Sequence, residues 1–155
     1  MTVERLYRCS AIGGPMEACA ELTLIAGQGI VGDRYYGRQD APGQNLTLIE
    51  ADVIEAFLAS LSRPLDLAIS RRNVVTRGTP LNALVGREFM LGPVYLRGVE
   101  LCEPCRGLGR ALSGPDITAA DVVRRLTHLG GLRADILNGG ILGLGDALRE
   151  PPPAG

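Results

Sequence analysis

Two cysteines three positions apart, Cys102 and Cys105, are the residues of this sequence best suited to chemistry. They belong to the segment Cys102-Glu103-Pro104-Cys105, which follows a run typical of a strand and precedes residues that can open a short helix. A thiol near a helix N-terminus is favoured as the thiolate by the helix dipole, and the neighbouring Arg106 adds positive charge. Such a thiol is suited to act as a nucleophile, a persulfide carrier or a ligand for a soft metal.

Other interpretations of the cysteines are weaker or remain open. Two half-buried thiols at the end of a strand are the ordinary outcome for an isolated Cys-x-x-Cys pair. A structural zinc site needs four ligands, and Cys9, Cys19 and His128 lack the spacing of a second ligand pair. A thioredoxin-like site requires a surrounding βαβ pattern, which the sequence does not show. Four unevenly spaced cysteines do not make a disulfide scaffold. We therefore expect reduced thiols and a cytoplasmic protein.

A second group of candidate residues surrounds a β-branched run in the middle of the chain. The group consists of Arg72, Asn73, Thr76 and Arg77, and its guanidiniums are suited to bind an anion. Side chains alternate along a strand, so only some of them can face one ligand. We favour Arg72 and Asn73 over Arg71, because solvated surface charge is the ordinary interpretation of both Arg71 and Arg77.

The Gly-rich loop from Gly27 to Gly43 contributes Asp33 and Arg34, for which a ligand contact and a local salt bridge are equally plausible. Its first six residues match the dinucleotide pattern G-x-G-x-x-G. That mechanism needs a helix starting at the glycines, and the residues that follow lack apolar periodicity. We therefore expect these glycines to form turns. His128, the only histidine, either lines the site or ends a helix.

Composition and charge exclude several classes of function. The formal net charge is −1, so the chain lacks the basic footprint of nonspecific nucleic-acid binding. No apolar run reaches the roughly 18 residues of a membrane span, and the first residues do not form a signal peptide. All 16 basic residues are arginine, so no Schiff-base lysine exists for pyridoxal phosphate chemistry.

The elements that must position these residues are short. With 21 glycines and 10 prolines spread without a period, the sequence predicts a mainly β fold over residues 1–150, as a single domain, and a disordered Pro-rich tail at 151–155. Strands are expected at 3–11, 21–25, 45–49, 74–76, 87–91, 94–101, 132–137 and 141–148. Helices are expected at 50–61, at 104–112, and from a cap at Asp116 or Thr118 through Leu126.

Five segments, taken together in this order, resemble a MOSC domain, the family named for the C-terminal domain of molybdenum-cofactor sulfurase. The resemblance runs from about Ile30 to Leu148. Tyr35 and Tyr36 depart from it, because many relatives carry a histidine there. The segments are Gly29-Ile30-Val31-Gly32-Asp33-Arg34, Arg71-Arg72-Asn73-Val74-Val75-Thr76-Arg77-Gly78, Leu81-Asn82-Ala83-Leu84-Val85-Gly86, Leu101-Cys102-Glu103-Pro104-Cys105, and His128-Leu129-Gly130-Gly131-Leu132-Arg133-Ala134 with Gly139-Gly140 and Gly145-Asp146 behind it.

The resemblance implies a MOSC-type β-barrel with a few short helices and a bound molybdenum cofactor, molybdopterin. Cys105 matches the signature cysteine best, as a molybdenum ligand or a persulfide carrier, whereas Cys102 is a resolving thiol or a packing residue. The resemblance also implies a set of cofactor-binding residues. These are Asp33, Arg34, Arg72, Asn73, Thr76, Arg77, His128 and Arg133.

Three functions follow from the resemblance. The first is an oxidoreductase that reduces N-hydroxylated compounds with electrons from a separate reductase. The second is a sulfur carrier that receives a persulfide on Cys105 from a pyridoxal phosphate-dependent cysteine desulfurase, for cofactor or metal-sulfur cluster assembly. The third is a binding domain without catalysis, in which loss of Cys105 changes neither ligand nor activity. No nucleic acid or membrane is expected as a partner.

Overall fold

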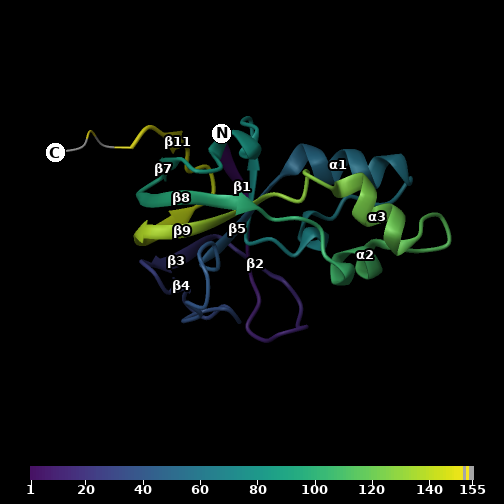
Figure 1. Ribbon diagram of the computed structural model, residues 1–155, viewed down its shortest axis with the longest axis horizontal. Coiled ribbons are helices and arrows are strands. Elements are labelled where there is room, and N and C mark those ends of the chain that lie inside the picture. Colours follow the sequence, from purple (N-terminus) through teal and green to yellow (C-terminus); the bar gives the residue numbers. More distant parts are fainter. Residues whose placement is uncertain (152, 154–155) are drawn as a thin grey trace.

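The computed structural model describes residues 1–151 and 153, and strands dominate it (Figure 1). The strands are β1 (Thr2–Arg8), β2 (Glu17–Cys19), β3 (Glu21–Ile25), β4 (Gly29–Ile30), β5 (Leu46–Glu50), β6 (Val74–Arg77), β7 (Glu88–Leu91), β8 (Val94–Leu101), β9 (Leu132–Asn138), β10 (Gly140–Gly143) and β11 (Leu148–Arg149). The helices are α1 (Ala51–Ser60), α2 (Arg106–Leu112) and α3 (Ala119–Leu126), with short 3₁₀ helices η1 (Leu67–Ser70) and η2 (Leu81–Leu84).

The strands form two sheets. The larger has the order β11-β7-β8-β9-β5-β6-β1-β2, and the smaller has the order β10-β3-β4. All pairings in the two sheets are antiparallel except β5 with β6, which run parallel with Leu48 opposite Val74. The expected mainly β class with a few short helices is confirmed. The expected barrel is wrong, because the sheets do not close: β11 pairs with β7 over two residues, and residues 145–148 meet the start of β1 through backbone hydrogen bonds and the isolated bridge Thr2–Ala147 rather than as a paired strand.

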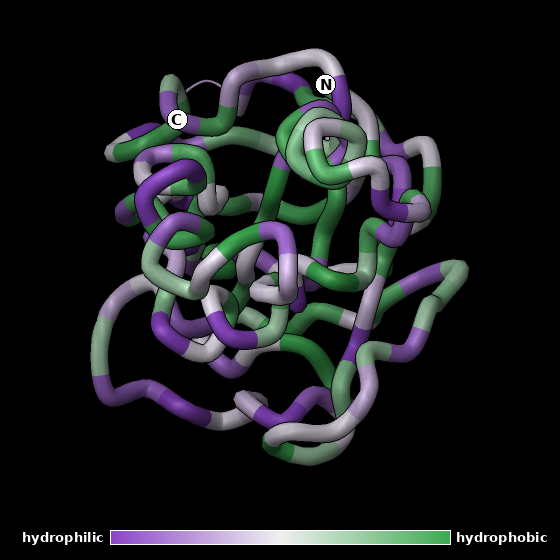
Figure 2. Tube along the Cα trace, turned by 90° about the vertical axis from the view of Figure 1, so that its right-hand side faces the viewer, coloured by the Kyte–Doolittle hydropathy of each residue, from purple (hydrophilic) through white to green (hydrophobic). Residues whose placement is uncertain are grey.

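The larger sheet separates two apolar clusters, which explains why its central strands are buried on both faces. In β5, Leu48 belongs to the cluster shared with the smaller sheet, and Ile49 belongs to the cluster shared with the helices. In β6, Val74 belongs to the cluster shared with the smaller sheet, and Val75 belongs to the cluster shared with the helices. Successive side chains of a strand point to opposite faces, so a run of apolar residues serves both clusters. In Figure 2 the most continuous hydrophobic stretches lie in the interior of the trace, whereas the projecting loops mix hydrophilic and hydrophobic residues.

The three helices lie together at one end of the molecule (Figure 1). Helix α1 buries Ala51, Ile54 and Leu58, three positions at helical spacing, so its apolar face covers the sheet. Helix α3 begins at Thr118, whose hydroxyl accepts the backbone N–H of Asp121 at 3.1 Å, which confirms one of the two expected caps. No helix in the described part of the chain has the length and apolar character that a bilayer span requires.

Several local features differ from the pattern of the sequence. Strand β2 and both 3₁₀ helices were not expected, and the last expected strand is divided into β10 and β11. The division follows from a turn in which Asp146 Oδ2 accepts the N–H of Gly143 at 2.8 Å. Gly27 and Gly32 have positive φ and lie in turns, as expected, whereas Gly29, which also has positive φ, opens the short strand β4, which was not expected. The expected tail at 151–155 falls largely outside the described residues.

Candidate functional site

A cavity of about 460 Å³ brings together five parts of the chain that are far apart in sequence. Both cysteines of the Cys-x-x-Cys segment line it, together with residues from the Gly-rich loop and from the junction of η1 with β6. Five of its lining side chains are guanidiniums, and only one is a carboxylate. The predicted site residues found here are Asp33, Arg34, Arg72, Asn73, Cys102, Cys105 and Arg133.

Cys105 is the N-cap of α2, and its side chain is exposed to the cavity. Its Sγ accepts the backbone N–H of Leu108 at 3.4 Å. This hydrogen bond is the largest cause that lowers the pKa of the Cys105 thiol, and the N–H of Gly107 and the charge of Arg72 act in the same direction against a smaller effect of burial. The thiolate is therefore favoured at the position where the sequence predicts it.

Cys102 differs from Cys105 because it is buried, with 3% of its surface exposed. Its backbone N–H donates to the carbonyl of Gly131 at 2.7 Å, and its carbonyl accepts from Nη2 of Arg72 at 3.2 Å. The residue therefore anchors the loop between β8 and α2, while its side chain borders the cavity.

Arg72 is a buried cation, 8% exposed, whose guanidinium donates to three backbone carbonyls. Its Nε reaches Gly130 at 2.9 Å, its Nη2 reaches Cys102, and its Nη1 reaches Ser70 at 3.4 Å. Among the described residues, no carboxylate lies within the 4.0 Å of an ion pair with Arg72. The hydrogen bonds of Arg72 therefore hold three segments of the cavity wall together, and no neighbouring carboxylate of the described chain compensates its positive charge.

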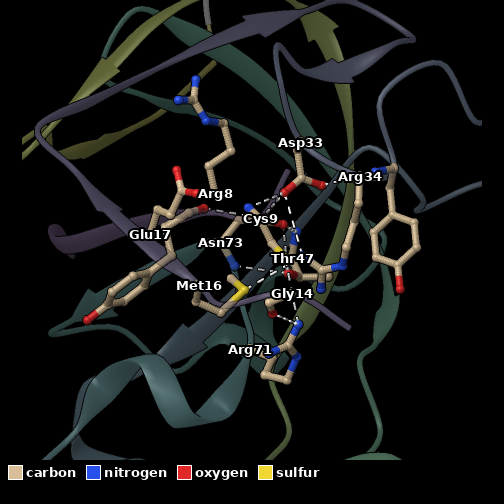
Figure 3. A network of polar contacts seen from close by, with 12 residues as sticks. Arg8, Cys9, Gly14, Met16, Glu17, Asp33, Arg34, Thr47, Arg71 and Asn73 are labelled. Atoms are coloured by element: carbon tan, nitrogen blue, oxygen red, sulfur yellow. Dashed lines mark hydrogen bonds and ion pairs between the residues drawn. The ribbon is translucent and has the colours of Figure 1, made fainter. Parts of the chain in front are cut away.

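Asp33 and Asn73 form a polar network behind the cavity wall (Figure 3). The Asp33 carboxylate accepts the backbone N–H of Cys9 at 3.0 Å and of Tyr35 at 3.2 Å. The amide oxygen of Asn73 accepts from the hydroxyl of Thr47 at 3.0 Å, and its amide nitrogen donates to the carbonyl of Tyr7 at 3.3 Å. Both residues border the cavity, but most of their polar atoms hold the surrounding backbone in place.

Two arginines of the Gly-rich loop share one aromatic ring. The guanidinium carbons of Arg34 and Arg38 lie 4.6 and 5.4 Å from the centroid of the Tyr35 ring, within the range of cation–π contact. Arg34 also lies 3.6 Å from the Asp33 carboxylate, so the local salt bridge that the sequence suggested is present. Both residues line the cavity as well. Arg38 was not identified from the sequence.

Arg71 lines the cavity, which corrects the sequence-based preference for surface charge at this position. Its φ of 59° is left-handed, because it is the C-cap of η1, so the strand alternation begins only after it. Its Nη2 donates to the carbonyl of Gly14 at 2.9 Å (Figure 3). The signal for this arrangement is Asp66, whose carboxylate accepts the N–H of Ala68 at 3.0 Å and thereby starts η1.

Three predicted site residues do not line this cavity. Thr76 is buried, and its hydroxyl donates to the carbonyl of Ile49 at 3.4 Å. Arg77 ends β6 on the outer surface, where three carboxylates surround it. His128 is exposed after α3, and its backbone N–H and Nδ1 both lie 2.9 Å from Glu103 carboxylate oxygens. All three residues are close in sequence to residues that line the cavity. Thr76 and Arg77 are directed away from it by the alternation of side chains along β6, and His128 by the turn after α3.

Arg133 of β9 lines the cavity and lies 3.7 Å from Glu100. Its neighbours along the wall are polar groups that the sequence did not single out, Gln44, Asn45 and Thr47. The Oδ1 of Asn45 accepts the N–H of Ile136 at 3.0 Å, which leaves its NH₂ group directed to other acceptors.

Solved structures of other proteins share this fold. The YuaD protein from Bacillus subtilis aligns with a TM-score of 0.80 at 19% sequence identity, over 96% of this chain and 94% of that chain. YiiM from Geobacillus stearothermophilus aligns with a TM-score of 0.70 at 12% identity, over 97% of this chain and 74% of that chain. YiiM from Escherichia coli aligns with a TM-score of 0.68 at 16% identity, over 99% of this chain and 71% of that chain. No curated protein matches the sequence.

The model of one protein family matches most of the chain. It is described as the MOSC domain, and it matches residues 36–149. This range contains the η1–β6 junction, the Cys-x-x-Cys segment and Arg133, whereas Asp33 and Arg34 precede it. The protein belongs to the MOSC domain family.

Proposed function

We propose that this protein binds a molybdenum cofactor in the arginine-lined cavity, with the Cys105 thiolate as the protein ligand of the metal. The observation that carries the proposal is the combination of an accessible thiol of lowered pKa with five guanidiniums around one cavity. A molybdopterin combines a phosphate, a polar heterocycle and a soft-ligand metal site, and each of these has a matching group in the wall.

The fit of the wall to such a group can be argued from its donors. Asp33, the single lining carboxylate, already accepts two backbone N–H groups and lies beside Arg34, so it does not compete with an anion. Arg72 carries a charge without a carboxylate partner in the described chain. Guanidiniums bind phosphate oxygens in a bidentate manner, and the NH₂ of Asn45 can donate to a heterocycle.

Each residue has a distinct part in the proposed activity. Cys105 offers a thiolate that the N–H of Leu108 stabilises, and Arg72 holds the Cys102 and Gly130 carbonyls that shape the surrounding loop. When bound, the cofactor supplies the electron-transfer chemistry that reduces N-hydroxylated compounds. The electrons come from a separate reductase in this proposal.

A sulfur carrier is the second candidate function, and one observation favours it. Cys105 is exposed to the cavity, whereas Cys102 is buried in the same wall. An accessible thiolate can hold a persulfide, and Cys102, the second thiol that lines this cavity, is the candidate to resolve it. A cysteine desulfurase is the proposed sulfur source for this form of the function.

The first experiment measures molybdenum and pterin per chain after purification from a host that makes the cofactor. Wild type, Cys105→Ser and the control Cys19→Ser are compared, because Cys19 lies in β2 and does not line the cavity. We expect metal and pterin in wild type and in Cys19→Ser, and loss of the metal in Cys105→Ser.

Wild-type protein that contains neither metal nor pterin would contradict the cofactor proposal. A mass increase of one sulfur atom on Cys105 in that protein would then favour the carrier. Equal metal in wild type and Cys105→Ser would contradict the ligand assignment and leave a binding domain.

A further inference from the structure

We propose that this cavity is also a sulfurtransferase site that loads Cys105 with sulfur from a small anionic sulfane-sulfur donor, with Arg71 and Arg38 binding the donor's charged oxygens. Thiosulfate is the simplest member of this class. The inference rests on the sulfur-carrier form of the proposed function and is independent of cofactor binding.

Positive charge is concentrated around this cavity. The whole chain has a formal net charge of −1, yet five arginines converge on one cavity. Arg34 is balanced by Asp33, and Arg133 lies beside Glu100. In the described residues, Arg38, Arg71 and Arg72 have no carboxylate within ion-pair distance.

Even an ionised Cys105 would balance only one of these three charges, so the cavity keeps a surplus of positive charge. Such a surplus in a walled cavity attracts an anion with two charges. The cavity therefore selects donors that carry their sulfur on an anion.

Two guanidiniums that line the cavity keep N–H donors without an acceptor among the described residues. Arg71 uses Nη2 for the Gly14 carbonyl and for a 3.8 Å contact with Cys9 Sγ, whereas its Nε and Nη1 have no acceptor in the described part of the chain. The guanidinium of Arg38 contacts only the Tyr35 ring within the described residues. Guanidiniums in this state present planar pairs of N–H donors to an oxyanion such as a sulfonate group.

The transfer of sulfur to Cys105 follows the chemistry of thiol–disulfide exchange. The Cys105 thiolate attacks the outer sulfur of thiosulfate, a new S–S bond forms on Cys105, and the S–S bond of thiosulfate breaks. Sulfite leaves with the electron pair of that bond, and the product is the Cys105 persulfide anion. One thiolate and one dianion give one persulfide anion and one dianion, so charge balances, and neither a proton nor an external oxidant is needed.

The guanidiniums act on the donor before and during this step. They hold the sulfonate oxygens, and they stabilise the charge of the departing sulfite. The cavity of about 460 Å³ is larger than a small inorganic anion, so a sulfur acceptor can enter beside the loaded cysteine.

The test uses the full chain from a host that does not make the pterin cofactor. The protein is incubated with thiosulfate, or in a parallel arm with glutathione persulfide, and the mass of Cys105-containing peptide is measured. Cyanide is then added as acceptor, and thiocyanate formation gives KM and kcat for each donor. We expect a gain of one sulfur on Cys105, catalytic thiocyanate formation, and no activity in Cys105→Ser.

Variants of Arg71 and Arg38 test whether these two residues bind the charged oxygens of the sulfur donor. Arg71→Gly suits the left-handed backbone at φ 59°, so it removes the guanidinium without adding strain, and Arg38→Gln removes an exposed side chain. We expect KM for the donor to rise about tenfold or more in each, because hydrogen bonds to charged groups are lost. Arg87→Gln, an exposed arginine outside the cavity, should retain the wild-type KM.

Two outcomes would overturn the proposal. If wild type gains no sulfur from either donor, the cavity is not a sulfurtransferase site, whatever the metal and pterin content of protein from a cofactor-producing host. If sulfur is gained but Arg71→Gly and Arg38→Gln have the same KM as Arg87→Gln, these arginines do not bind the donor.

Discussion

Arg72 and Arg77 lie five positions apart in one segment and differ completely in their surroundings. Arg72 is buried, and its guanidinium donates to three backbone carbonyls. Arg77 lies at the surface, where its Nε is 2.5 Å from Glu4 and its Nη2 is 2.5 Å from Glu55, with Asp52 at its Nη1. One charge is uncompensated beside a thiol, and the other is surrounded by an excess of carboxylates.

The comparison indicates that an arginine without a neighbouring carboxylate identifies the anion-binding cavity better than the presence of an arginine alone. Both arginines are equally good phosphate ligands by their chemistry. Arg77 cannot attract an anion, because the neighbouring acids carry more negative charge than it neutralises. The Arg77 guanidinium donates hydrogen bonds to the carboxylates of Glu4 and Glu55, which raises the pKa of Arg77 and lowers the pKa of Glu4.

The largest expected effect is the loss of stability when Arg72 is replaced. Arg72→Met leaves three carbonyls without their donor, and we expect about 3 kcal/mol lower free energy of unfolding, since each unsatisfied buried acceptor costs roughly 1–3 kcal/mol and the cavity admits some water. Chemical denaturation of Arg72→Met and Arg77→Met measures the comparison. Equal destabilisation by both variants would contradict it.

Gly130 allows the contacts of Arg72 to be tested through the Cys102 carbonyl that accepts its hydrogen bond. A Cβ on Gly130 would lie 2.2 Å from the Cys102 carbonyl oxygen, so Gly130→Ala must displace the carbonyl that Arg72 binds. We expect a loss of about 2 kcal/mol or more, as for other overpacked sites. Gly140→Ala is the control, because its Cβ meets only ordinary contacts, the nearest at 3.6 Å. Thermal unfolding that separates the two variants by less than one degree would show that the loop adapts freely.

The reactivity of Cys105 tests whether the charge of Arg72 reaches the thiol. The pKa of Cys105 is lowered mainly by the N–H of Leu108 and also by Arg72, so the alkylation rate should reach half its maximum at a pH below about 8.5, the usual value of a free thiol. Arg72→Met should shift this midpoint to higher pH and slow alkylation at pH 7 several-fold. Arg72→Lys, which keeps the charge, should shift it less, and Arg77→Met should not shift it.

That profile is measured with iodoacetamide over pH 5–10, with peptide mapping to follow Cys105 alone. A midpoint that does not respond to Arg72→Met would limit the activation of the thiol to the backbone N–H groups.

The smallest expected effect belongs to the surface cluster around Arg77. The pKa of Glu4 is lowered by Arg77, so the pair stabilises the fold at neutral pH and loses this contribution as pH falls through the lowered pKa. Arg77→Met should therefore have a lower melting temperature than wild type at pH 7 and low salt. The two melting temperatures should converge at acid pH or in 1 M NaCl. A difference that persists in high salt would indicate that packing of the Arg77 side chain matters more than its charge.

Local patterns were sufficient for most elements and for the central thiol. The alternation of β3, the helical spacing of α1 and the cap at Thr118 each depend on neighbours in sequence, and each is found where it was expected. The position of Cys105 at the start of α2 is local as well. The two 3₁₀ helices were not predicted, because so few residues leave no periodic signal, and η1 is the element that turns Arg71 into the cavity.

Which chemical groups are available follows from the amino-acid sequence alone: arginine without lysine, a Cys-x-x-Cys segment before a helix, and short strands separated by turns. Only the tertiary structure decided which charges meet. The carbonyls that bind Arg72 include residues 30 and 58 positions away along the chain. No local pattern encodes such a contact, because it depends on the mutual packing of β8, β9 and η1 once the sheet has formed.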